Sequence, residues 1–166
     1  MDEKILAQKA MIGDRDAFAE LYTLYKDRLY RYAFFKLHSE ADAMDAVSDC
    51  ICEAFKYIIS LKNAEAFAAW IFRILYRCCS RSITEQAKGR EQEELSDNTA
   101  AYTEDFAMTE LKEALAKLSE EEKDIVLLST VVGYNSKEIS KILGIKPTTA
   151  RSKLSRALAK MREFLE

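Results

Sequence analysis

The 166 residues carry a formal net charge of −3 and are 49% hydrophobic, which is enough apolar side chain to form real cores. One Pro and four Gly argue against a sheet protein built on tight turns and favour an all-α fold. A chain that is acidic overall can bind nucleic acid only where its basic residues are segregated on one surface. No stretch resembles a membrane span or the apolar run of a signal peptide, so we expect a cytoplasmic protein without membrane insertion.

Two helices are predicted at the N-terminus, over about residues 5–12 and 14–37, with Gly13 between them. The second helix carries large apolar side chains every three or four residues, most of them aromatic: Phe18, Leu21, Tyr25, Leu29, Tyr32 and Phe35. Aromatic side chains can stack on bases, but a stripe at helical spacing is more typical of a core. We interpret this stripe as core.

An acidic helix is predicted to follow, opened by Ser39 as N-cap. One face of this helix carries four carboxylates: Asp42, Asp45, Asp49 and Glu53. Like charges on one face repel one another slightly, and a helix face that is merely solvated more often mixes signs. The pattern therefore suggests docking to a basic protein surface, with a solvated face as the alternative.

A loop over residues 60–65 leads into a fourth helix, for which Asn63 is the expected cap. Arg73, Arg77 and Arg81 follow one line of this helix, and no acidic residue occurs between Phe67 and Thr84. The helix is a candidate nucleic-acid surface, with a solvated basic face again as the alternative.

The four cysteines do not have the spacing of a metal site. Cys50 and Cys52 form one close pair, Cys78 and Cys79 are adjacent, and His38 is the only histidine. Zinc sites normally need wider spacing or histidine partners. We predict reduced cysteines that fill gaps in the core, and neither a metal nor a cofactor.

The segment from Thr84 to Ala107 holds seven acidic and two basic residues and few large apolar side chains. This composition predicts a flexible acidic linker over residues 84–106. The chain would then consist of a helical domain over residues 1–83 and a second one over residues 107–166. The second domain is predicted to begin with a helix over about 104–118, followed by a helix whose N-terminus has a capping box formed by Ser119 and Glu122.

The last thirty residues are typical of a helix-turn-helix. Asn135 and Glu138 form a second capping pair, Gly144 ends a short helix, and Pro147 stands at the first position of the next. From Gly144 to Arg162 the chain has six Lys or Arg and no acidic residue. A helix that is basic on one face and follows a glycine turn can enter a major groove. The alternative is an ordinary helical hairpin whose basic face is only exposed to solvent.

No arrangement of residues supports catalysis, because the chain lacks a nucleophile–base pair, a glycine-rich phosphate loop and a metal-ligand spacing. Several runs instead resemble bacterial RNA polymerase sigma factors. The first domain carries A-F-A-E-L-Y-T-L-Y-K-D-R-L-Y-R-Y-A, S-E-A-D-A-M-D-A-V-S-D and F-A-A-W-I-F-R-I. The second carries L-S-E-E-E-K-D-I-V-L-L and S-K-E-I-S-K-I-L-G-I-K-P-T-T-A-R-S-K-L-S-R-A-L-A-K-M-R. Two such domains with a short linker resemble the extracytoplasmic-function (ECF) group.

The resemblance implies a non-enzymatic promoter-specificity subunit that binds core RNA polymerase and promoter DNA and is held by an anti-sigma factor. The clamp helices of the largest polymerase subunit would bind the acidic helix, through Asp42, Asp45, Ser48, Asp49 and Glu53. The minus-ten element would be bound by Lys62, Asn63, Arg73, Arg77 and Arg81. The minus-thirty-five element would be bound by Lys146, Thr148, Thr149, Arg151, Ser152, Lys153 and Arg156.

Some positions depart from the family pattern. The family often has Gln where Ser48 stands, and it has Asn and Asp where Arg77 and Arg81 stand; basic residues are usual at Thr84 and Glu85. Promoter preference therefore does not transfer. The alternative function is a stand-alone DNA-binding regulator that does not engage polymerase, and another is a purely structural interaction protein. The acidic linker is expected either to mask the basic helices or to act as a passive spacer.

Overall fold

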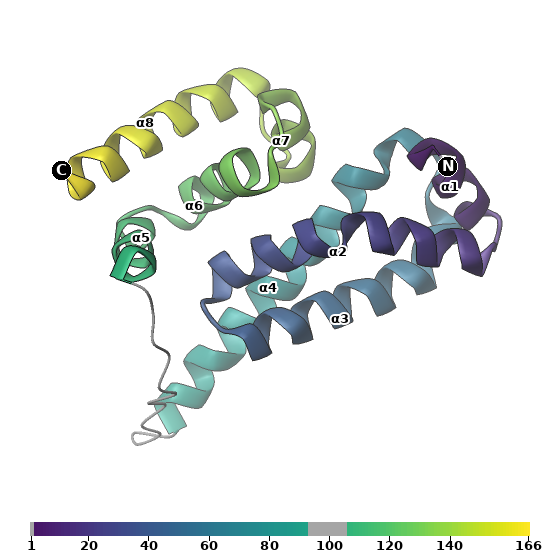
Figure 1. Ribbon diagram of the computed structural model, residues 1–166, viewed down its shortest axis with the longest axis horizontal. Helices are drawn as coiled ribbons and strands as arrows, with labels where there is room; N and C mark the ends of the chain where they lie inside the picture. The colour runs from purple at the N-terminus through teal and green to yellow at the C-terminus, as the bar shows by residue number, and fades with distance from the viewer. Residues whose placement is uncertain (1, 93–105) are drawn as a thin grey trace.

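The computed structural model describes residues 2–92 and 106–166, and every regular element in them is helical (Figure 1). The predicted all-α class with two helical domains is confirmed for these residues. The N-terminal domain consists of α1 (Glu3–Met11), α2 (Arg15–Leu37), α3 (Glu40–Tyr57), the 3₁₀ turns η1 (Ile58–Ser60) and η2 (Ala64–Ala66), and α4 (Phe67–Gln92). The C-terminal domain consists of α5 (Phe106–Ala116), α6 (Glu120–Val126), the π-helical turn η3 (Leu127–Val132), α7 (Ser136–Leu143) and α8 (Pro147–Leu165).

The helix starts follow the capping residues in the sequence. Asp14 caps α2 by accepting from the Ala17 amide, and Ser39 caps α3 by accepting from the Asp42 amide. Both predicted capping boxes are present, at the starts of α6 and α7. Each side-chain acceptor satisfies one of the amides that the first turn leaves without a partner. Asn63 caps the short turn η2 and not α4 directly, because α4 is preceded by that 3₁₀ turn.

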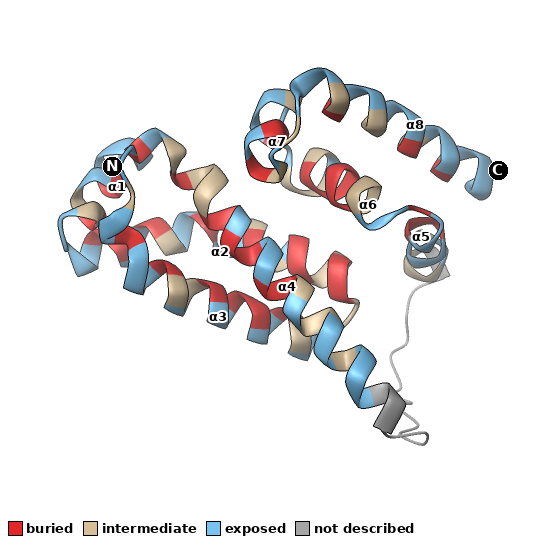
Figure 2. Cartoon of the chain, turned by 180° about the vertical axis from the view of Figure 1, so that it is seen from behind, coloured by how far each residue is buried: buried red, intermediate tan, exposed pale blue. Residues whose placement is uncertain are grey.

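The N-terminal core lies where α2, α3 and α4 pack together, as the buried faces in Figure 2 show. The predicted stripe of α2 is buried from Phe18 to Tyr32, and Phe35 at its end is partly buried. Tyr25 packs edge-on against Phe67 of α4, with ring centroids 5.1 Å apart. The aromatic stripe is therefore core, as predicted.

Helix α4 continues beyond the point where a linker was predicted. The prediction placed flexible chain from Thr84 onward, whereas α4 extends to Gln92. The chain from Glu85 to Gln92 is rich in Glu, Gln, Ala and Lys, which are strong helix formers. The helix continues after its large apolar residues end, but it is no longer buried there. Its C-terminal part is mostly exposed (Figure 2). The remainder of the predicted linker, residues 93–105, lies outside the described residues.

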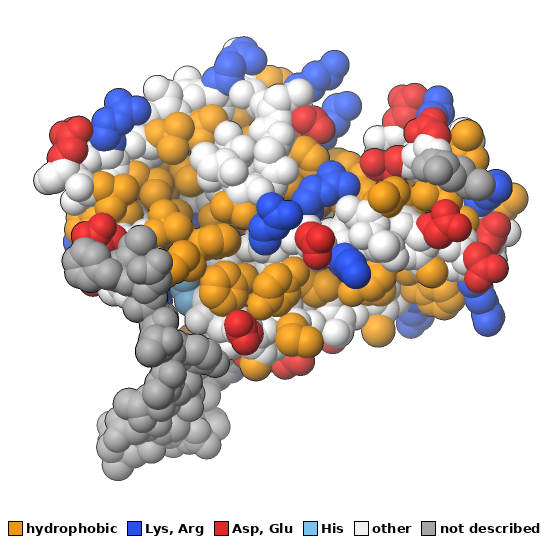
Figure 3. All heavy atoms as spheres, in the orientation of Figure 1, with side chains coloured by type: hydrophobic (Ala, Val, Ile, Leu, Met, Phe, Trp, Pro, Cys, Tyr) orange, Lys and Arg blue, Asp and Glu red, His pale blue; other side chains and the backbone are white. Residues whose placement is uncertain are grey.

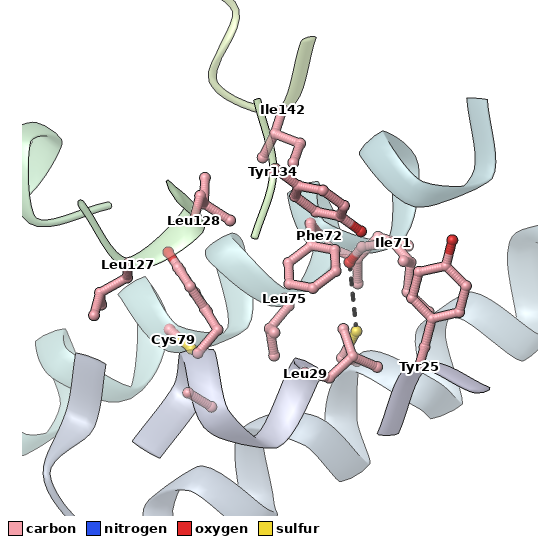
Figure 4. Packing of buried hydrophobic residues seen from close by; sticks show 14 of the residues in the cluster. Tyr25, Leu29, Ile71, Phe72, Leu75, Cys79, Leu127, Leu128, Tyr134 and Ile142 are labelled. Atoms are coloured by element: carbon pink, nitrogen blue, oxygen red, sulfur yellow. Dashed lines mark hydrogen bonds between the residues drawn. The ribbon is translucent and has the colours of Figure 1, made fainter. Parts of the chain in front are cut away.

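The two domains pack directly on each other. Helix α2 contacts η3, and α4 contacts α7. Figure 4 shows Leu29, Phe72, Leu75 and Cys79 of the N-terminal domain facing Leu127, Leu128, Tyr134 and Ile142 of the C-terminal domain. Phe72 and Tyr134 meet edge to face, with ring centroids 5.3 Å apart. Nothing in the sequence analysis predicted this contact between the domains.

Gly144 ends α7 in the left-handed conformation, with φ of +71°, and its amide donates to the Ser140 carbonyl. A Cβ at this position would meet no atom within 4 Å. The backbone conformation alone should therefore penalise Gly144→Ala, by about 1 kcal/mol of unfolding free energy. Urea denaturation of the two proteins measures this difference.

Gly89→Ala is the matched control. Gly89 lies within α4, without positive φ and with no atom near its would-be Cβ. Alanine is the better helix former, so this change should cost nothing and can add up to about 1 kcal/mol. A loss of stability in the Gly89 variant that equals the loss in the Gly144 variant would contradict the assignment of Gly144 as a left-handed cap.

Candidate functional site

The start of α8 presents the candidate recognition surface. Lys146 holds the N-cap position without a side-chain hydrogen bond to the helix, and Pro147 follows at the first helical position. Arg151, Ser152 and Arg156 line a shallow polar hollow together with Ser155. Lys146 and Thr148 are exposed, and Thr149 is half-buried. Lys and Arg side chains project from the edge formed by α7 and the start of α8 (Figure 3).

Ser155 was missed by the sequence analysis. It lies four residues after Arg151 and three after Ser152, so the helical spacing that selected its neighbours applies to it as well. The analysis weighted basic side chains and passed over a hydroxyl among them. Serine can donate to or accept from a phosphate or a base edge, which suits this surface.

Lys153 forms an ion pair within the fold. Its ammonium lies 2.7 Å from a carboxylate oxygen of Glu121 in α6, and its side chain is half-buried. Lys160 pairs likewise with Glu122, at 3.0 Å. The Ser119 amide, together with Lys160, holds the pKa of the Glu122 carboxyl below its usual value. The first turn of α6 therefore neutralises two of the lysines of α8, and Arg151 and Arg156 are the basic side chains that line the hollow.

The candidate minus-ten residues are divided among three environments. Lys62 and Asn63 lie in the exposed segment between η1 and η2, where the Asn63 side chain accepts from the Glu65 amide. Arg77 is exposed on α4. Arg73, on the same helix, donates to the Lys141 carbonyl of α7 and so contacts the C-terminal domain.

Arg81 points toward α3 instead. It donates to the Cys78 sulfur at 3.1 Å and lies 3.9 Å from the Glu53 carboxylate. The three arginines therefore do not form one free basic stripe. The sequence placed them on one line correctly, but it could not reveal the neighbours that each would meet.

The loop also exposes apolar side chains. Ile59 of η1 is 70% exposed and Tyr57, at the end of α3, is 48% exposed. Sequence reasoning passed over both because a short apolar run at a helix end reads as core. Exposed apolar and aromatic groups beside a polar loop can stack with an unpaired base.

The acidic residues of α3 border a groove between α3 and the second half of α4. Asp42, Asp45, Ser48 and Asp49 line one side, and Arg81, Ser82, Glu85 and Gln86 line the other. Asp45, Ser48 and Asp49 are exposed, whereas Asp42 is half-buried and accepts a hydrogen bond from Gln86. Glu53 is half-buried near Arg81. The exposed carboxylates of Asp45 and Asp49 therefore lie along one side of this groove.

Three of the cysteines are buried in the core, as predicted, but the prediction is wrong for Cys52, which is exposed on the outer side of α3. Burial raises the pKa of the Cys78 thiol, and it raises that of Cys79 to about 12, so both stay protonated at neutral pH. Within residues 2–92 and 106–166, no group of three or more His, Cys, Asp or Glu is arranged to hold a metal ion. None of the helices in the same residues combines the length and apolar character needed to cross a bilayer.

Two family models match the chain, the Sigma-70 region 2 model over residues 21–89 and the Sigma-70 region 4 model over residues 108–161. RNA polymerase sigma factor SigV of Bacillus subtilis is 30% identical over 142 residues, which cover 84% of this chain and 86% of SigV. The ECF sigma factor SigM of Mycobacterium tuberculosis strain H37Rv is 27% identical over 170 residues, covering 99% of this chain and 84% of SigM.

Two solved structures share the fold. CnrH, in complex with the cytosolic domain of CnrY, matches with a TM-score of 0.80 and 23% identity over 98% of this chain and 96% of CnrH. The sigma factor RpoE of Bartonella quintana, in complex with the anti-sigma factor NepR, matches with a TM-score of 0.73 and 21% identity over 89% and 96% of the two chains. The 30% identity to SigV over most of both chains, together with matches to both sigma-70 regions, identifies the family. The chain belongs to the sigma-70 family of RNA polymerase sigma factors, in its ECF group, whose members are promoter-specificity subunits.

Proposed function

We propose that this sigma factor binds its partners through three surfaces. The groove beside α3 binds polymerase, the region of η1, η2 and α4 binds the minus-ten element, and the start of α8 binds the minus-thirty-five element. The α8 surface is the main support for this proposal. Lys146, whose side chain does not cap the helix, and the exposed Arg151 and Arg156 form a basic edge on a protein that is acidic overall. Duplex DNA attracts such an edge through its phosphates and is read by side chains that reach the bases.

The acidic groove supports the polymerase contact. Exposed carboxylates on one side of a groove suit a basic helical partner, and complementary charge speeds the encounter and selects the partner. The protein acts without catalysis, in the cytoplasm, where polymerase and promoter are found. An anti-sigma factor is the expected further partner, since RpoE is seen bound to the anti-sigma factor NepR and CnrH to the cytosolic domain of CnrY.

In-vitro transcription with purified core polymerase tests the proposed function. Added protein should co-purify with the core enzyme and redirect initiation to a defined promoter set. A stand-alone DNA-binding regulator would bind duplex DNA but do neither. Absence of both effects would contradict the proposed function, whatever the affinity for DNA.

The double variant Asp45→Asn/Asp49→Asn tests the acidic groove. Both side chains are exposed, so the domain should fold as before, while affinity for core polymerase should fall about tenfold. The loss should shrink as salt rises, because exposed charges are screened. Fluorescence titration with core enzyme measures the change.

Asp27→Asn is the matched control, since Asp27 is an exposed carboxylate of α2 outside the groove. It should leave the affinity unchanged. If the control weakens binding as much as the double variant does, net charge and not the groove determines polymerase binding.

Arg156→Ala tests the α8 surface. If Arg156 reads a base, its loss should cost about 1–3 kcal/mol and relax specificity at one position. If it binds a phosphate, affinity should fall equally for all sequences and the salt slope should drop by about one. Lys153→Ala should cost less, because Glu121 already holds that ammonium. Binding to promoter duplex across a salt series separates these cases.

Lys112→Ala is the control, because Lys112 is exposed on α5, and Figure 1 shows α5 remote from the start of α8. It should change affinity little. Unchanged affinity in the Arg156 variant would return α8 to the role of an ordinary solvated helix.

A further inference from the structure

Helix α1 packs on the minus-ten loop, which we define as residues 58–66 with the turns η1 and η2. Figure 1 shows α1 beside the segment that leads into α4. The inner face of α1 is buried through Leu6, Ala7 and Ala10. None of the three proposed binding surfaces includes this helix. Its position against the loop nevertheless allows it to influence the shape of the loop.

The first turn of α1 is connected to both sides of η2. The Lys4 ammonium lies 3.1 Å from the carboxylate of Glu65, which is part of η2. The neighbouring Glu3 carboxylate accepts a hydrogen bond from the Tyr25 hydroxyl of α2. The Tyr25 ring packs edge-on against Phe67, the first residue of α4, with the ring centroids 5.1 Å apart. Two adjacent side chains of α1 are therefore connected to η2 and to the residue that follows it.

Tyr25 gives α1 a fixed point of attachment, because its ring is 1% exposed and belongs to the core. The pair of Lys4 and Glu65 is different, since its side chains are 53% and 67% exposed. Exposed ion pairs contribute little to stability by themselves. This pair can still favour one position of η2, because α1 is already held in place by Tyr25 and by its own buried face.

The minus-ten loop itself consists of short turns. In η1 the Leu61 amide donates to the Ile58 carbonyl, and in η2 the Asn63 side chain accepts from the Glu65 amide. Hydrogen bonds in 3₁₀ turns have poorer geometry than those of an α-helix. Lys62 and Asn63, between the two turns, are exposed. A loop of this kind gains order from a helix that packs on it.

Order in this loop affects the capture of an unpaired base. A loop that becomes ordered only on binding loses conformational entropy at that moment, whereas a loop already held in its binding shape does not. The side-chain oxygen of Asn63 is engaged within η2, so its NH₂ group is the part that can donate to a base. A shift of η2 relative to η1 would therefore change the surface that the base meets.

We propose that Glu3 and Lys4 are positioning residues for the minus-ten loop. Through Tyr25 and Glu65 they hold η2 in the shape that accepts one unpaired base, and they do not touch the base themselves. Base capture rests on the proposed function above, but the order of the loop in the free protein can be measured without DNA.

The double variant Lys4→Met/Tyr25→Phe removes both connections and keeps an aromatic ring at position 25. Glu3 and Glu65, which lose their partners, are both exposed, so no charge is left buried and the fold should persist. Circular dichroism should therefore be unchanged. Hydrogen exchange followed by mass spectrometry should show the amides of residues 61–66 exchanging about tenfold faster than in wild type.

Tyr30→Phe/Lys26→Met is the matched control, because it removes the same two chemical groups from α2. The Tyr30 ring stacks on Phe34, a contact that phenylalanine keeps, and Lys26 is exposed. Exchange in the loop should equal that of wild type. The conservative variant Lys4→Arg keeps a cation opposite Glu65 and should also exchange as wild type does.

Base capture is measured with the holoenzyme. The probe is the single non-template strand of a promoter that wild type selects in vitro, with each base of the minus-ten element replaced in turn by an abasic site. Loss of the captured base should weaken wild-type binding about tenfold. The double variant should lose most of this preference, because its affinity for the intact strand falls while its affinity for the abasic strand does not. A general structural defect would lower both affinities, and that for a minus-thirty-five duplex as well.

Two results would overturn the positioning role: loop exchange in the double variant equal to that of wild type, or an undiminished preference for the intact strand. If the double variant loses helix content, Lys4→Met alone replaces it, with an expected change of about twofold in the same two measurements. Faster loop exchange in the variant, with no base preference in the wild-type holoenzyme, would leave the positioning of η2 intact and contradict the proposed minus-ten function.

Discussion

A lysine and an aspartate that lie 88 positions apart in the sequence form a buried ion pair in the interface between the two domains of this sigma factor. Taking two charges out of water is expensive, and their attraction offsets that cost only when the geometry is good. Here the Tyr32 hydroxyl and the Glu120 carboxylate complete the surroundings of the pair. Removing one partner of a buried pair typically costs about 3–5 kcal/mol. That is comparable to the whole stability of many small domains, so the pair can decide whether the domains stay together.

The π-helical turn η3 lies in the middle of this interface. Its residues Leu127 and Leu128 are almost fully buried against the other domain. The Thr130 hydroxyl donates to the carbonyl of Val126, the last residue of α6, a type of bond that often bends helices. Turns of this kind often occur at functional positions. In this chain the irregular turn sits beside the contact that must break for the domains to separate.

The first turn of α6 contacts both the other domain and α8. Three successive glutamates at the start of α6 pair with three lysines, one in the N-terminal domain and two on α8. Negative charges at the N-terminus of a helix interact favourably with the helix dipole, so the same glutamates stabilise α6. One short acidic turn thus supports a capping box, a domain contact and the positioning of α8.

Local features of the fold could be predicted well from the sequence. The capping boxes at Ser119 and Asn135, the glycine end of α7 and the proline start of α8 each depend on residues within four positions, and all are present. The end of α4 was predicted too early, because a fall in hydrophobicity marks the loss of a buried face while helix propensity continues to Gln92. The prediction had taken the loss of apolar residues as the end of the helix, although helix propensity and burial are separate properties.

The candidate site was only partly predictable for a different reason. The sequence identified which side chains share a helix face, but not what each one meets across the fold. Lys153 with Glu121, Arg73 with Lys141 and Lys36 with Asp124 are all contacts between distant segments. Lys36 in particular looks like any lysine near a helix C-terminus, where lysines are common. Only the packing of the second domain turns it into a buried residue.

In this structure the two domains pack on each other, so the distance between them in the free protein is expected to be short. Pulsed electron resonance between spin labels at Lys62 and Glu163, with Cys52 replaced by Ser, measures the separation of the domains directly, since all three positions are exposed. A single short distance in the free protein, replaced by a long one after addition of core polymerase, is the predicted result. The same distribution in both states, or a long distance in the free protein, would contradict it.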